Sequence, residues 1–292
     1  MVLRALRLGT STALRLRGGR PFEEWFGATR LVGYRFGSPQ ADETWILLHG
    51  LASTALSWHR TAWHLRRDCR VIVPELSGLG GTESIGGGLG VADGVRVISA
   101  LIERESPGRR VTLAGNSLGA WIALRIALER PELLDRLVLI AAAGYRDQDW
   151  ERIKELVTVR DSQDVDPLLR ALFVRTPLGL RLARKGFQRA YGSPEVASVL
   201  AKLREEDAYG DRELQSLALP TAVIWGEHDG IFDFAVAERM AAALPQAHLY
   251  RLDDCGHAAH WEKPSAIDRA LDDFRQRYPT PRPADAAEEV PA

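Results

Sequence analysis

The chain has 292 residues, a net charge of −1 and a composition of 46% hydrophobic and 26% charged residues. That length can bury a large core in one or two domains. The near-neutral charge gives no support for a nucleic-acid partner, and no apolar run has the length of a membrane-spanning helix. Cys69 and Cys255 are too few for a disulfide framework or a thiolate metal site, so we expect a cytoplasmic protein with two free thiols.

Residues 1–30 form a basic N-terminal segment without the apolar stretch or cleavage site of a secretory signal. Leucines are interspersed with its arginines. We expect the segment to pack on its own domain or to fray, and weak peripheral contact with an anionic membrane surface is the alternative. At the other end, residues 279–292 are mainly Pro, Ala and Glu, which predicts a disordered tail.

Short apolar runs bounded by turn residues predict buried strands. They are Leu31–Phe36 at the sheet edge, Trp45–Leu48, Val71–Val73, Val111–Ala114, Leu137–Ala141, Ala222–Trp225 and His248–Leu252. Helical patterns are clearest at Gly94–Arg104, Leu118–Glu129, Ala235–Ala243 and Ala266–Tyr278. Strands that alternate with helices predict an α/β fold with a mostly parallel central sheet flanked by helices. We assign residues 31–144 and 217–278 to this core, whose ligands should bind at the carboxyl ends of the strands.

Residues 145–216 interrupt the alternation because they contain helical patterns only. Asp166-Pro167 and Ser193-Pro194 each look like an N-cap followed by proline at the first helical position. We expect this segment to form a helical lid over the carboxyl edge of the sheet. Its arginines, among them Arg170, Arg181 and Arg184, fit an ordinary solvated face; the alternative is a basic rim around an apolar entrance for an acyl chain or a membrane surface.

Residues 115–119 read Gly-Asn-Ser-Leu-Gly between a predicted strand and a predicted helix. Glycines on both sides of Ser117 allow a very tight turn, because side chains there would make the strand and the helix collide. The turn lifts the Ser117 hydroxyl above the sheet edge and places the Leu118 amide at a helix N-terminus. This pattern predicts a nucleophilic serine, although a chance match on an ordinary turn is the plain alternative.

A base and an acid for Ser117 follow later strands. His257 comes directly off the last strand after Gly256, and His260 is the rival base. Asp229 follows the preceding strand and can orient the His257 ring. Glu227 and Asp233 are alternative acids, and an Asp in this loop can also simply cap the next helix. After the first strong strand, His49-Gly50 leads to Leu51, whose amide we infer to be a second oxyanion donor beside Leu118.

The glycine-rich stretch Gly78–Gly90 is not a dinucleotide fingerprint, because its third glycine position is Glu83 and no clean helix opens there. We interpret it as a flexible loop beside the site. No sequence feature calls for a metal or an organic cofactor.

Together, His49-Gly50, the 115–119 turn, Trp225–Asp229 and Cys255–His257 resemble the α/β-hydrolase family from about Leu31 to Tyr278. The resemblance implies nucleophile Ser117, acid Asp229, base His257 and oxyanion amides at Leu51 and Leu118. The sequence departs from the family in the loop after Pro74. There the family often has Asp followed by Gly-His-Gly, and this chain has Glu75 followed by Gly78-Leu79-Gly80.

The serine nucleophile disfavours the branches that attack with aspartate. The sequence is similar to lipases and esterases of the monoacylglycerol-lipase type, which implies hydrolysis of a small-molecule carboxylic ester through an acyl-enzyme. The alternative within the family is a carbon–carbon bond hydrolase of meta-cleavage products. An alternative of another class is a non-catalytic ligand-binding protein with this fold.

Overall fold

The computed structural model describes residues 12–76, 82, 89–107, 110–146, 148–176 and 184–279. Its strands are β1 (Arg20–Phe26), β2 (Thr29–Phe36), β3 (Glu43–Leu48), β4 (Arg70–Pro74), β5 (Arg110–Asn116), β6 (Arg136–Ile140), β7 (Thr221–Gly226) and β8 (Ala247–Leu252). They form one sheet in the order β1-β2-β4-β3-β5-β6-β7-β8. β1 and β2 are antiparallel to their neighbours, and the pairs from β4 to β8 are parallel. The expected α/β class is confirmed.

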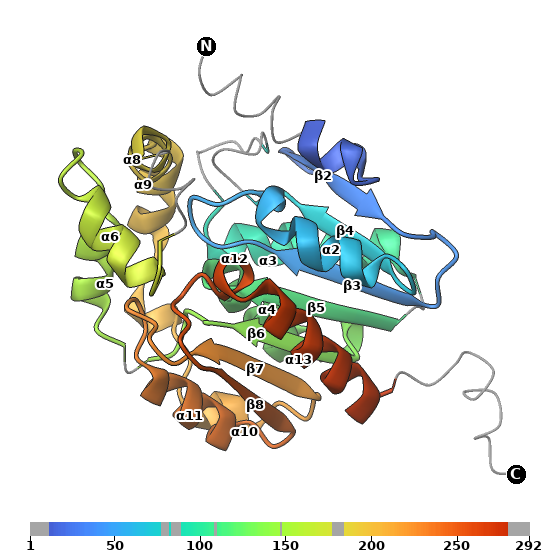
Figure 1. Cartoon of the computed structure of the whole chain (residues 1–292). Helices are drawn as coiled ribbons and strands as arrows, with labels where there is room; N and C mark the ends of the chain where they lie inside the picture. Colours follow the sequence, from blue (N-terminus) through green and yellow to red (C-terminus); the bar gives the residue numbers. More distant parts are fainter. Residues whose placement is uncertain are drawn as a thin grey trace, which may run out of the picture.

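Helices cover both faces of the sheet. They are α2 (His59–Leu65), α3 (Val91–Glu105), α4 (Leu118–Glu129), α11 (Phe234–Ala243), the short α12 (Ala259–Glu262) and α13 (Pro264–Arg277). Figure 1 shows α2 and α13 in front of the sheet and α3 and α4 behind it. The central strands are buried on both faces, which explains their continuous apolar sequences: all five residues of β6 are buried.

Between β6 and β7, the described residues form the helices α5 (Trp150–Val157), α6 (Val165–Leu172), α8 (Arg184–Tyr191), α9 (Pro194–Lys202) and α10 (Asp211–Gln215). In Figure 1, α5, α6, α8 and α9 stand together at one side of the sheet. The Ser193 side chain caps α9 as expected, accepting the N–H of Val196 at 3.3 Å. The expectation for Asp166 is wrong: α6 begins two residues earlier, and Asp164 is its N-cap.

The N-terminal region differs from the expectation that the sheet begins at Leu31. β1 lies within the segment assigned to residues 1–30, and a helical turn precedes it at residues 12–16. Leu14 is fully buried, whereas Leu16 is 81% exposed.

Some expectations stay predictions because they concern residues outside the described ranges. These are residues 1–11, the tail from 280 onward, Arg181 and most of Gly78–Gly90. In the described part of the chain, no helix has the length and apolar character to cross a membrane.

Candidate active site

Ser117 occupies a strained backbone conformation between β5 and α4, with φ 53° and ψ −117°. Non-glycine residues rarely adopt a positive φ, and such strain is typical of functional turns. A Cβ on Gly115 would lie 2.3 Å from the carbonyl carbon of Gly119, and a Cβ on Gly119 would lie 2.4 Å from the carbonyl oxygen of Leu48. The collision expected from the sequence is therefore the reason for both glycines.

His257 and Asp229 meet beside this turn. The Nδ1 atom of His257 lies 2.8 Å from Oδ2 of Asp229, and the Asp229 side chain is fully buried. The other carboxylate oxygen, Oδ1, accepts the N–H groups of Ile231 at 2.8 Å and Phe232 at 3.0 Å. These backbone donors fix the carboxylate, which can in turn hold the imidazole ring in one orientation with its Nε2 atom directed away from the acid.

The alternative acids and the alternative base from the sequence do not make the contacts that a catalytic acid or base needs. Glu227 forms an ion pair with Arg251 near the surface, and Asp233 caps α11 by accepting the N–H of Ala235 at 2.8 Å. His260 is buried and stacks on Trp58, with 5.5 Å between the ring centroids. Its Nδ1 has no hydrogen-bond partner among the described residues. Burial, followed by the nearby His257 and His49, lowers the pKa of His260 to about 3. A base with no acid partner and so low a pKa is poorly suited to activating a serine.

The two expected oxyanion donors lie on either side of Ser117. Leu118 is the first residue of α4, so its N–H has no acceptor within the helix. Leu51 belongs to the turn after β3, which approaches the serine closely: a Cβ built on Gly50 would lie 3.2 Å from Cβ of Ser117. The next residue in that turn, Ala52, also has a positive φ of 55°.

A cavity of about 340 Å³ brings most of these residues together: Ser117, His257, Leu51 and Leu118 all line it. Asp229 lies behind His257 and does not. Among the hydrogen bonds of the described residues, none joins Ser117 to His257. Such bonds are often long or poorly aligned in the absence of substrate.

The inserted helices form much of the cavity wall. Their lining side chains are mostly apolar and include Trp150, Ile153, Val157, Phe187 and Leu200. Lys154 is the one cationic lining residue among those described, and Arg170, Arg175, Arg184 and Arg189 do not line the cavity. The arginines that the structure describes in this segment are therefore not part of the cavity wall.

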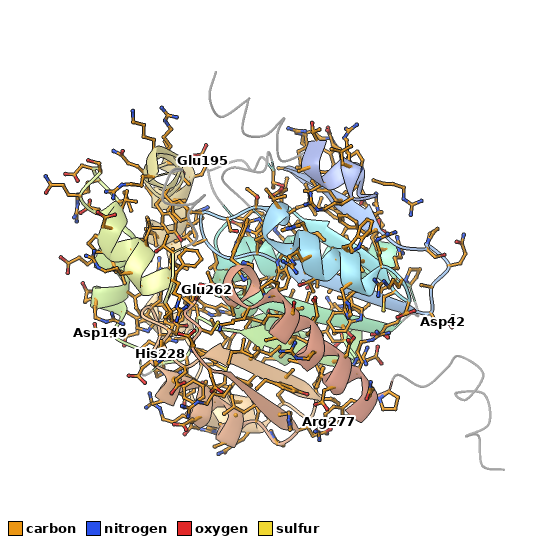
Figure 2. The ribbon with its side chains drawn as sticks, viewed as in Figure 1. Asp42, Asp149, Glu195, His228, Glu262 and Arg277 are labelled. Carbon is orange, nitrogen blue, oxygen red and sulfur yellow. The ribbon has the colours of Figure 1, made fainter. Side chains whose placement is uncertain are left out.

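Glu262 connects the histidine loop to the inserted helices and lies between them in Figure 2. Its two carboxylate oxygens accept the N–H of Gly256 at 2.7 Å and the N–H of Arg175 at 2.9 Å. No local sequence pattern predicts this contact, because its partners are 6 and 87 residues away. The role of Glu75 was missed too: it is buried, and its Oε2 atom accepts the N–H of Ala55 at 3.0 Å. The departure from the family pattern at that position was a usable signal.

Comparisons with known proteins identify the family and the fold of the chain. Residues 45–264 match the family described as alpha/beta hydrolase fold. A 2-hydroxy-6-oxononadienedioate/2-hydroxy-6-oxononatrienedioate hydrolase of Cupriavidus pinatubonensis is 28% identical over 252 residues, which cover 80% of this chain and 86% of that protein. A membrane phospholipase A, described as a bacterial virulence factor, has a similar structure with a TM-score of 0.83 and 27% identity, over 96% of this chain and 93% of the other. A carboxylesterase from Bacillus subtilis shares the fold, with a TM-score of 0.77 at 17% identity over 92% and 97% of the two chains.

Proposed function

The chain belongs to the alpha/beta hydrolase fold family, and on that premise we propose that it is a serine hydrolase that cleaves carboxylic esters. Ser117 is the nucleophile, His257 the general base and Asp229 the residue that orients the base. The backbone N–H groups of Leu51 and Leu118 form the oxyanion hole. The strained Ser117 turn, the 2.8 Å contact between Asp229 and His257 and the shared cavity support these roles.

The reaction has two acyl-transfer steps. His257 takes the Ser117 proton as the serine oxygen attacks the ester carbonyl, and the two amides stabilise the negative charge on the carbonyl oxygen. His257 then passes the proton to the departing alcohol, which leaves an acyl-enzyme. A water molecule, deprotonated by His257, attacks the acyl group and releases the acid and free Ser117.

The apolar wall of the cavity is the observation that favours an ester over a carbon–carbon substrate. The substrate named for the Cupriavidus relative is a dioate, which carries two carboxylates. Among the described lining residues, Lys154 is the single cation, and Glu75 adds a carboxylate that would repel such an acid. An uncharged ester with a hydrocarbon acyl group suits this wall better. We propose that the inserted helices, residues 145–216, act as the lid over that acyl group.

A fluorophosphonate probe and a substrate panel test the proposal. The folded protein should be labelled, and the Ser117→Ala variant should lose labelling together with activity, by about 10⁴-fold or more. Absence of labelling in folded protein would favour the non-catalytic binding alternative. The panel compares p-nitrophenyl acetate, butyrate and octanoate with the nonadienedioate. Turnover of the dienedioate alone would replace ester hydrolysis by carbon–carbon bond cleavage.

A further inference from the structure

The end of α6 and the residue after it contact both the cavity and the loop that carries His257. Leu172 and Phe173 line the cavity. The carbonyl oxygen of Leu172 also accepts the N–H of Ala258 at 2.9 Å. On the other side of His257, a Cβ built on Gly256 would lie only 3.0 Å from Cα of Phe173. The backbone on both sides of His257 therefore touches a part of the wall that faces the substrate.

Glu262 makes a second connection between these two parts of the protein. It is the last residue of α12, and its carboxylate reaches back to the residue before His257. One oxygen accepts the N–H of Gly256 at 2.7 Å, and the other accepts the N–H of Arg175 at 2.9 Å. Gly256 is buried, so its N–H needs an acceptor within the protein. One carboxylate thus joins the His257 loop to segment 172–175 (Figure 2).

The two connections make the position of His257 depend on segment 172–175. One connection attaches before His257 and the other after it, so a displacement of the segment moves the backbone at both sides of the ring. The ring has to keep its Nδ1 atom 2.8 Å from Asp229, and a misplacement of about 1 Å in a catalytic group can cost about 100-fold in rate. An acyl chain that packs on Leu172 and Phe173 restrains the segment.

We propose that Glu262 is a positioning residue that couples segment 172–175 to His257, so that an acyl chain packed on the segment holds the general base in its working position. This inference rests on the ester hydrolysis proposed above. It adds that the acyl group of the substrate takes part in setting the position of the base.

The Glu262→Gln variant tests the coupling. Glutamine has one acceptor oxygen and turns an amide N–H toward the other backbone donor, so at least one of the two bonds is lost and the link is broken. An acetyl group offers little surface to the segment. We expect kcat for p-nitrophenyl acetate to fall by about 10-fold or more, as for the loss of one hydrogen bond to a charged acceptor. The fall for p-nitrophenyl octanoate should be smaller by about 4-fold or more, which corresponds to one methylene group packed against the segment.

Arg175→Pro breaks the link from its other end, because proline has no backbone N–H. It should reproduce the difference between the two esters without any change at Glu262. Thermal unfolding shows which variants are folded at the assay temperature.

Glu227→Gln is the matched control, because it makes the same chemical change in the loop that carries Asp229. Glu227 pairs with Arg251 near the surface, and such pairs contribute little, so kcat for both esters should be retained. Equal losses for acetate and octanoate in Glu262→Gln would overturn the proposal, because general damage or the loss of a charge near the base affects both esters alike. Unchanged kcat for both esters would overturn it as well. Fluorophosphonate labelling of the wild type separates these results from a failure of the serine hydrolase proposal, which would abolish labelling.

Discussion

Asp229 carries two hydrogen-bonding roles on one carboxylate, and a single substitution separates them. Asp229→Asn keeps an acceptor for the N–H groups of Ile231 and Phe232 but presents an amide N–H to Nδ1 of His257. The ring then adopts the tautomer that cannot accept the Ser117 proton. We expect kcat for p-nitrophenyl butyrate to fall by about 10³- to 10⁴-fold, measured at steady state.

Asp233→Asn is the control, because it makes the same chemical change four residues away. Asp233 caps α11, and asparagine caps helices about as well as aspartate. Stability and kcat should both be retained. An equal loss of kcat in the two variants would contradict the assignment of Asp229 as the residue that orients His257.

His260 should make the stability of the protein depend on pH. Burial lowers its folded pKa from 6.5 to about 3. Between these two values the unfolded chain binds a proton that the folded protein does not, so the contribution of His260 is lost as the pH falls through this window. One such proton changes the free energy of unfolding by about 1.4 kcal/mol per pH unit.

The His260→Phe variant tests this dependence, because phenylalanine keeps an aromatic ring against Trp58 and removes the titrating group. Urea unfolding at a series of pH values below 6.5 gives the free energy of unfolding for both proteins. The variant should show the shallower decline. Parallel curves for the variant and the wild type would mean that His260 does not titrate in this way.

At the level of elements, the turn from β5 to α4 depends on the absence of side chains. A Cβ on Gly119 would come within 2.4 Å of backbone atoms of β3, which cannot move away without disturbing the sheet. We expect Gly119→Ala to destabilise the protein by about 1–3 kcal/mol and to shift the Leu118 amide, which lowers kcat as well. Chemical denaturation and steady-state kinetics measure the two effects.

Gly186→Ala is the control for Gly119→Ala, because we expect it to have the opposite effect on stability. Gly186 lies in α8, and no atom comes within 4 Å of a Cβ built there. Alanine should stabilise the helix by about 0.5–1 kcal/mol. Equal destabilisation by both substitutions would show that the effect at Gly119 is not steric.

The predictability of these elements follows from how each is buried. Central strands such as β6 have continuous apolar sequences, and the sequence located them to within two residues. β1 was missed because it is an edge strand that buries only Phe22 and Phe26, so its sequence lacks an apolar run. The start of α6 was misplaced because Asp164 and Asp166 are both plausible caps, and the sequence does not distinguish them.

At the level of the whole molecule, the sequence predicted which residues form the candidate site, but it did not predict which residues line the cavity. Ser117, Asp229 and His257 each follow a strand, so the parallel sheet brings their loops to one edge. The apolar wall depends on how the inserted helices pack, which no local pattern shows. Backbone bonds attach the end of α6 to the other loops of the site: the N–H groups of Gly230 and Ala258 donate to Ala171 at 3.0 Å and Leu172 at 2.9 Å.

Because the inserted helices supply the apolar wall, they should determine which acyl chains the enzyme accepts. Val157 of α5 lines the cavity and is 8% exposed. Val157→Trp should fill part of the space that a long acyl chain needs and leave room for a short one. We expect kcat/KM for p-nitrophenyl octanoate to fall by about 10-fold or more relative to that for the acetate, which corresponds to the loss of about two buried methylene groups.

Val174→Trp is the control, because Val174 belongs to the same inserted segment but is 38% exposed and does not line the cavity. Its chain-length profile should match that of the wild type. If both variants lost octanoate activity equally, the inserted helices would act through the stability of the segment rather than through the cavity wall. If neither lost it, the acyl chain would lie elsewhere, and the acyl site would have to be sought outside this wall.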